Sequence, residues 1–184
     1  MIQLAVAKSV MKLWKLLRPV SATEDADAVV ALLLKPADDD FSVLFVNRVS
    51  SPSDPWSGQT ALPGGKREPN DEDLKQTVIR ETLEETNINL KDHCRFLGTT
   101  GIEHSTPRPE MRIVPFVILL EHEPIIRLNE KELEGYAWIP LKELAKRRGK
   151  AKFSFGEFPA YIVGDVAIWG LTYRIVESLL RMIG

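Results

Sequence analysis

Two long apolar runs, separated by a short acidic turn, stand out in the first third of the chain. Residues 28–35 are almost continuously apolar, and residues 41–49 form a second run after the turn Pro-Ala-Asp-Asp-Asp. Apolar runs of this length that are bounded by turns are typical of buried strands. The pattern therefore predicts a hairpin of two buried strands.

Later segments alternate between strand and helix patterns. The predicted strands are residues 94–103, 111–121 and 135–140, with a short strand leading into Gly64. The predicted helices are residues 141–147 and 165–183, the second with Trp169, Ile175 and Leu179 among its apolar residues. Strands mixed with helices in the middle and near both ends predict an α/β sandwich with a mixed sheet.

The first 22 residues form a basic segment with helical spacing. Its apolar residues are Val6, Val10, Leu13 and Leu17; its cations are Lys8, Lys12, Lys15 and Arg18. This pattern predicts an amphipathic helix docked on a domain of residues 23–184. A targeting segment or a membrane-surface helix would show the same spacing. We therefore expect a cytoplasmic protein and leave organelle targeting open.

Composition excludes several classes of protein. The chain has 184 residues, 44% of them hydrophobic and 27% charged, which is ordinary for one globular domain. A net charge of -2 gives no reason to expect a nucleic-acid partner. The single cysteine, Cys94, excludes an internal disulfide, and no histidines are paired at zinc-ligand spacing. No apolar stretch is long enough to cross a bilayer, so integral membrane association is not expected.

Acidic residues crowd the segment that follows Gly64. A helix is predicted from Asp71 to about Thr86, with Asn70 or Asp71 as its cap and acids in its first turn. Asn87 stands where a left-handed residue often ends a helix. The side of this helix that is predicted to be buried carries the apolar residues Leu74, Val78 and Leu83.

On such a helix Glu81 lies beside both Glu84 and Glu85. Like charges in these positions destabilise an isolated helix by roughly 0.2–0.5 kcal/mol per pair. A divalent cation such as Mg²⁺ would turn this repulsion into shared ligation, because it prefers carboxylate oxygens. Gly64 and Gly65 let the backbone approach a metal or phosphate closely. A solvated acidic helix face is the alternative interpretation.

The segment resembles the Nudix box, G-x5-E-x7-R-E-U-x-E-E-x-G-U, in which U is aliphatic. Glu72 lies eight residues before Arg80, and Arg80-Glu81, Glu84-Glu85 and Ile88 follow in register. There are three departures from the box. Six residues separate Gly65 from Glu72, Thr82 occupies an aliphatic position, and Asn87 replaces a glycine.

This resemblance implies a Nudix-type α/β/α sandwich that binds Mg²⁺ or Mn²⁺ and hydrolyses a diphosphate linked to another moiety. It implies that Glu81, Glu84 and Glu85 are metal ligands, joined by the Gly65 carbonyl. It also implies that Arg80 orients the carboxylates together with Glu72.

A second acidic segment, within residues 128–144, resembles the acid-rich loop that precedes a Trp-containing strand in this family. Glu132, six residues before Trp138, is the candidate for an added metal ligand or general base. Glu130 and Glu134 are its rivals, and all three also fit surface charges on a turn.

Residues 44–65 resemble the corresponding segment of the Nudix coenzyme A diphosphatases. Arg48, Gly58 and Pro63-Gly64-Gly65 carry this resemblance. It implies that substrate is bound by Arg48, Gly58, Gln59 and Gly64. Ser53 and Asp54 stand where that subfamily usually has a second arginine, which puts coenzyme A itself in doubt.

The expected partner is therefore a small-molecule nucleotide, with coenzyme A or a derivative as the leading substrate. ADP-ribose, nucleotide sugars and nucleoside triphosphates are alternatives with the same chemistry. A nucleotide-binding Nudix module without activity is an alternative of another class. A homodimer is compatible with the sequence.

Overall fold

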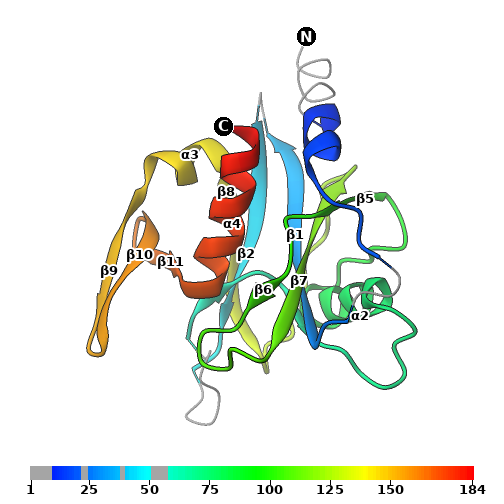
Figure 1. The fold of residues 1–184 in the computed structure, drawn as a ribbon, viewed down its shortest axis with the longest axis horizontal. Helices are drawn as coiled ribbons and strands as arrows, with labels where there is room; N and C mark the ends of the chain where they lie inside the picture. Colours follow the sequence, from blue (N-terminus) through cyan, green and yellow to red (C-terminus); the bar gives the residue numbers. More distant parts are fainter. Residues whose placement is uncertain (1–9, 22–24, 38–39, 51–57) are drawn as a thin grey trace.

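A mixed β-sheet forms the centre of the computed structural model, which describes residues 10–21, 25–37, 40–50 and 58–184 (Figure 1). Its main path runs in the order β3-β2-β1-β7-β5, while β4 pairs with β1, β6 with β7 and β8 with β2. The strands are β1 (Ala28–Ala37), β2 (Asp40–Arg48), β3 (Thr60–Ala61), β4 (Gly64–Lys66), β5 (Cys94–Thr99), β6 (Glu103–His104), β7 (Arg112–Leu120) and β8 (Leu133–Pro140). β1 and β7 are parallel, whereas the other pairs are antiparallel.

The first two strands form the predicted hairpin. They pair from Leu34 with Val43 to Ala37 with Asp40, and nearly all their apolar side chains are buried. Both runs read as continuously apolar because the sheet is covered on both faces.

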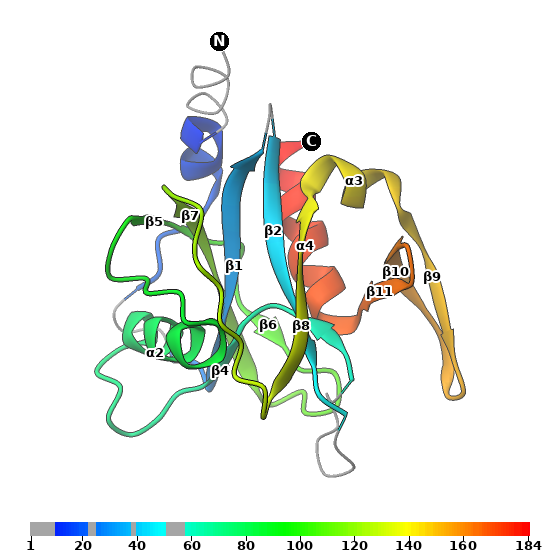
Figure 2. The same ribbon diagram turned by 180° about the vertical axis from the view of Figure 1, so that it is seen from behind.

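Helices cover the two faces of the sheet, as Figures 1 and 2 show from opposite sides. On one face α2 (Leu74–Thr86) contributes Leu74 and Val78 to a buried cluster with Leu33 and Phe116. On the other face α4 (Gly170–Ile183) and α3 (Leu141–Lys146) bury a second cluster of side chains. The predicted α/β class with a mixed sheet is confirmed.

A small antiparallel sheet extends from one side of the molecule (Figure 1). It consists of β9 (Arg148–Phe153), β10 (Gly156–Val163) and β11 (Val166–Trp169). The prediction of one helix over residues 165–183 is wrong at its start. Residues 166–169 pair with β10, from Val163 with Val166 to Ala160 with Trp169, and α4 begins only at Gly170. Pairing with a neighbouring strand here overrides the local helical pattern.

The N-terminal segment is helical at residues 10–16 and packs on the α4 side of the sheet. Val10, Leu13 and Leu17 are buried there, whereas Trp14 and Leu16 are exposed. Val6 and Lys8 lie outside the described residues. The division at residue 22 remains a prediction. No helix in the described parts of the chain has the length and apolarity needed to span a membrane.

Candidate functional site

The acidic helix α2 begins later than predicted. Asp73 is its N-cap, accepting a hydrogen bond from Gln76 N–H at 2.7 Å, so the cap is neither Asn70 nor Asp71. The first turn, from Leu74 onward, consequently contains no acid. The C-terminal end of α2 agrees with the prediction, because the backbone of Asn87 is in the left-handed region with a φ of 62°. Leu83 was predicted to be buried but is 42% exposed.

Asp71 fixes the loop before α2 through a bidentate contact with Arg80. Arg80 Nε donates to Asp71 Oδ1 at 3.1 Å, and Nη2 donates to Oδ2 at 2.9 Å. The Arg80 guanidinium lowers the pKa of Asp71 from 3.8 to about 2. Asp71 therefore takes the position expected for Glu72, whose side chain makes no ion pair with Arg80 in the described structure. Five residues separate Gly65 from Asp71, so the extra residue of the box lies between this acid and the helix.

Glu81 lies directly over the backbone of Gly65. Arg80 Nη1 donates to Glu81 Oε1 at 2.9 Å. A Cβ placed on Gly65 would stand 2.4 Å from the carboxyl carbon of Glu81, so only glycine leaves room for this acid. Burial raises the pKa of Glu81 against the opposing effect of Arg80. The structure thus brings Arg80, Glu81 and Gly65 together as predicted from the sequence.

Glu85 is the most deeply buried of the acids, with only 3% of its surface exposed. Gly64 N–H donates to Glu85 Oε2 at 2.8 Å, and Arg48 Nη1 lies 3.8 Å from Oε1. The pKa of Glu85 is raised to about 8, chiefly by burial and to a smaller extent by the charges of Glu81 and Glu132, against the opposing effects of Gly64 N–H and Arg48. The local dielectric environment therefore favours the protonated acid until a positive charge compensates it.

Glu132 and Glu84 stand at the edge of this cluster. Glu132 acts electrostatically on both Glu81 and Glu85, and Asn129 Nδ2 donates to its Oε1 at 2.9 Å. Glu84 is more open to solvent, with Arg80 Nη1 3.4 Å from its Oε2. Glu81 and Glu85 thus lie against the Gly64-Gly65 turn, and Glu132, from a segment distant in sequence, is near enough to act on both.

The chemistry of these groups fits a hard divalent cation. All the candidate donors are oxygens, and the missing side chain of Gly65 lets the Glu81 carboxylate lie against the backbone there. In the part of the chain that the structure describes, no three acidic, histidine or cysteine side chains already converge as a metal site. A cation would be held by Glu81, Glu85 and Glu84, and its charge would draw them together.

A cavity of about 260 Å³ opens beside the acids. Arg48, Gln59 and Gly64, predicted to bind substrate, line it, as does Gly65. Gly58 is not among the lining residues; it has a left-handed φ of 67°, and its N–H donates to the Arg48 carbonyl at 3.1 Å. Other lining residues were not predicted for the site, among them Lys66, Ser105, Met111 and Thr172. No local motif marks Ser105 or Thr172, because the packing of β6 and α4 brings them here.

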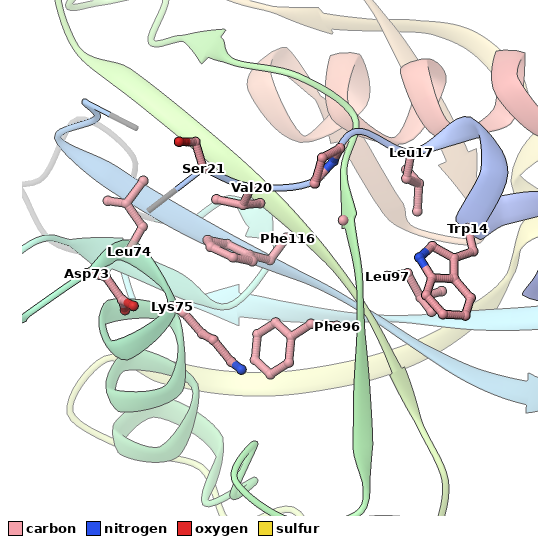
Figure 3. A pocket seen from close by; sticks show the side chains of 12 residues that line it. Trp14, Leu17, Val20, Ser21, Asp73, Leu74, Lys75, Phe96, Leu97 and Phe116 are labelled. Atoms are coloured by element: carbon pink, nitrogen blue, oxygen red, sulfur yellow. The ribbon is translucent and has the colours of Figure 1, made fainter. Parts of the chain in front are cut away.

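A larger cavity of about 430 Å³ lies between residues 14–21, the start of α2 and β5 (Figure 3). Lys75 Nζ stands 4.6 Å from the ring centroid of Phe96, and the Phe96 and Phe116 rings pack edge to face. None of the residues predicted for the site lines this second cavity, and it shares no lining residue with the first.

Comparison with known families agrees with the geometry of the site. A family model described as the NUDIX domain matches residues 25–158, which is more than half of the chain. The chain belongs to the Nudix family. The family prediction made from the acidic helix is therefore confirmed.

Two curated Nudix relatives are coenzyme A diphosphatases by name. The peroxisomal coenzyme A diphosphatase ndx-8 of Caenorhabditis elegans is 30% identical over 66% of this chain and 52% of its own length. The human mitochondrial coenzyme A diphosphatase NUDT8 is 27% identical over 77% of this chain and 63% of its own length. The chain thus spans less than two thirds of either relative.

A solved structure supports the Nudix fold. The NUDIX domain of Shewanella oneidensis NrtR, solved with ADP ribose, superposes with a TM-score of 0.56 at 19% identity. The match covers 88% of this chain and 90% of that one.

Proposed function

We propose that this chain is a divalent-metal-dependent hydrolase that cleaves the diphosphate of a nucleoside diphosphate linked to another moiety. The observation that carries the proposal is the position of Glu85. Its carboxylate is nearly fully buried, yet it lies against Gly64 N–H and Arg48, which both line the cavity. A buried acid is costly in free energy, and a bound cation offsets that cost.

Each residue of the cluster has a proposed role. Glu81, Glu84, Glu85 and the Gly65 carbonyl hold Mg²⁺ or Mn²⁺, and Glu132 is the added ligand or general base. Arg80 orients the carboxylates, anchored by Asp71. A bound cation of this kind neutralises charge on a diphosphate and lowers the pKa of a bound water. Arg48 and Lys66 line the cavity as the cations that attract an anionic substrate.

Coenzyme A or a derivative is the proposed substrate, cleaved to a phosphopantetheine and adenosine 3′,5′-bisphosphate. The two relatives named as coenzyme A diphosphatases support this choice. Ser53 and Asp54, in place of the second arginine, weigh against it and lie outside the described residues. ADP-ribose, nucleotide sugars and nucleoside triphosphates are the competing substrates.

A nucleotide-binding module without activity is the alternative of another class. It has no need to keep Glu81, Glu84 and Glu85 together against their mutual repulsion, and this favours the enzyme. The expected compartment remains the cytoplasm, and the peroxisomal and mitochondrial names of the relatives support organelle targeting as its rival. A homodimer remains a prediction.

The test is product analysis with Mg²⁺, offering coenzyme A, ADP-ribose and a nucleoside triphosphate in parallel. We expect coenzyme A to be cleaved best and Glu85→Gln to lose about 1,000-fold in rate, because ligation contributes several kcal/mol. Glu157→Gln, on the surface of β10, is the matched control and should retain full activity. Preference for another substrate would reject coenzyme A as the substrate but would retain the proposed metal-dependent hydrolysis of a diphosphate. No metal-dependent cleavage of any of them would favour the binding module.

A further inference from the structure

Ser105, one of the residues that line the cavity beside the acids, carries a hydroxyl with no hydrogen-bond partner among the described residues. Ser105 is 2% exposed, and its Oγ is buried and unpaired there. Buried polar atoms are nearly always hydrogen-bonded, and an unsatisfied one lowers stability. Because Ser105 lines the cavity, a molecule that fills the cavity can supply the missing partner.

The residues on both sides of Ser105 are held by one arginine of α4. Arg174 Nε donates to Glu103 Oε2 at 3.1 Å, and Nη1 donates to Thr106 Oγ1 at 3.0 Å. Its Nη2 donates to the His104 carbonyl. Ser105 N–H also donates to the Met111 carbonyl at 3.1 Å. The backbone position of Ser105 is therefore fixed before a ligand arrives, which lowers the entropy cost of binding.

The surroundings of Ser105 indicate what kind of group it meets. Apolar side chains form much of the cavity wall: Met111, Ile113, Leu171 and Ile175. The cations Arg48 and Lys66 line the same cavity and are suited to phosphate oxygens. A neutral hydroxyl among apolar walls is suited instead to an uncharged polar group of the substrate's organic part.

We propose that Ser105 hydrogen-bonds an uncharged hydroxyl, amide or ring nitrogen of the substrate and so determines which half of the substrate enters the cavity. This inference rests on the proposed function, since it assumes a substrate with two halves joined by a diphosphate. At about 260 Å³ the cavity is smaller than typical sites for whole ligands, which are roughly 300–1,000 Å³. It therefore takes one half and leaves the other outside.

Binding of substrate halves tests this directly and needs no turnover. Isothermal titration would compare 4′-phosphopantetheine, adenosine 3′,5′-bisphosphate, AMP and ribose 5-phosphate on the wild type and on Ser105→Ala. We expect one of the fragments to bind about 3- to 10-fold more weakly to the variant, the value of one hydrogen bond, and the others to bind unchanged. The melting temperature of Ser105→Ala should not fall, because the substitution removes an unsatisfied group.

Thr100→Val is the matched control. Thr100 Oγ1 is also buried without a partner among the residues described, but Thr100 does not line the cavity. Thr100→Val should leave the affinities for all four fragments unchanged.

Three results would overturn the proposal. Equal fragment binding by wild type and Ser105→Ala would mean that water alone satisfies the hydroxyl. Uniform weakening with a lower melting temperature would indicate a structural role, and a wild type that binds no fragment would remove the site. If only AMP and ribose 5-phosphate bind, coenzyme A is rejected as the substrate. Weaker binding of one of these two fragments by Ser105→Ala would then support the proposal, and equal binding would overturn it.

Discussion

Among single residues, Gly65 is the position where a side chain would collide with a candidate metal ligand. A Cβ there would stand 2.4 Å from the Glu81 carboxyl carbon, so Gly65→Ala must displace this acid. We expect kcat/KM to fall about 10- to 100-fold, since misplacement by about 1 Å is enough for such a loss. Gly149→Ala on β9, whose Cβ would meet Ile162 at 3.6 Å, is the control measured alongside it. Equal activity of the two variants would contradict the prediction.

Thr82 is a residue whose replacement should stabilise the protein rather than damage it. It is fully buried at an aliphatic position of the Nudix box, and its Oγ1 has no partner within the described structure. Valine has nearly the same shape without the hydroxyl. We therefore expect Thr82→Val to raise the free energy of unfolding by about 1 kcal/mol, measured by urea denaturation. Destabilisation would show that the hydroxyl is satisfied after all.

The loop before α2 and the helix itself are joined by Asp71 and Arg80, and this connection depends on pH. The folded-state pKa of Asp71, about 2, lies below its ordinary value of 3.8. The unfolded chain therefore takes up the proton first, so the stabilisation is complete above about pH 5 and is lost as pH falls towards 2. Asp71→Asn should be about 2 kcal/mol less stable than wild type at pH 6. That difference should shrink by pH 3; urea denaturation that shows a constant difference would disprove the linkage.

Among the secondary-structure elements, the predictions were correct where the sequence pattern of a single strand or helix was sufficient. The hairpin of β1 and β2 and the body of α2 follow from apolar patterning alone. The start of α2 was misplaced because Asn70, Asp71 and Asp73 are all acceptable caps in sequence, and Asp73 is the one that accepts from Gln76 N–H. β11 was mistaken for helix because its residues continue directly into α4 and were included in one helical pattern, although they pair with β10 across the two residues Gly164 and Asp165.

For the whole molecule, residues 10–17 are expected to contribute to the stability of the central sheet. Leu13 is 1% exposed and belongs to the same buried cluster as Ile175 of α4. Leu13→Ala should lower the free energy of unfolding by about 2–5 kcal/mol through the cavity it leaves. Leu16→Ala, on the exposed side of the same helix, should change it by less than about 0.5 kcal/mol. Similar losses in both variants would mean that the segment does not pack as described.

The sequence by itself determined the Nudix acids, the glycine turn and the α/β class, because each depends on spacing within a short segment. Only the tertiary structure decided that Asp71 rather than Glu72 holds Arg80, and that Glu132 acts on Glu81 and Glu85. It also brought Ser105 into the cavity. These relations join residues that loops and strand pairing bring together, and no local pattern encodes distances across a folded sheet.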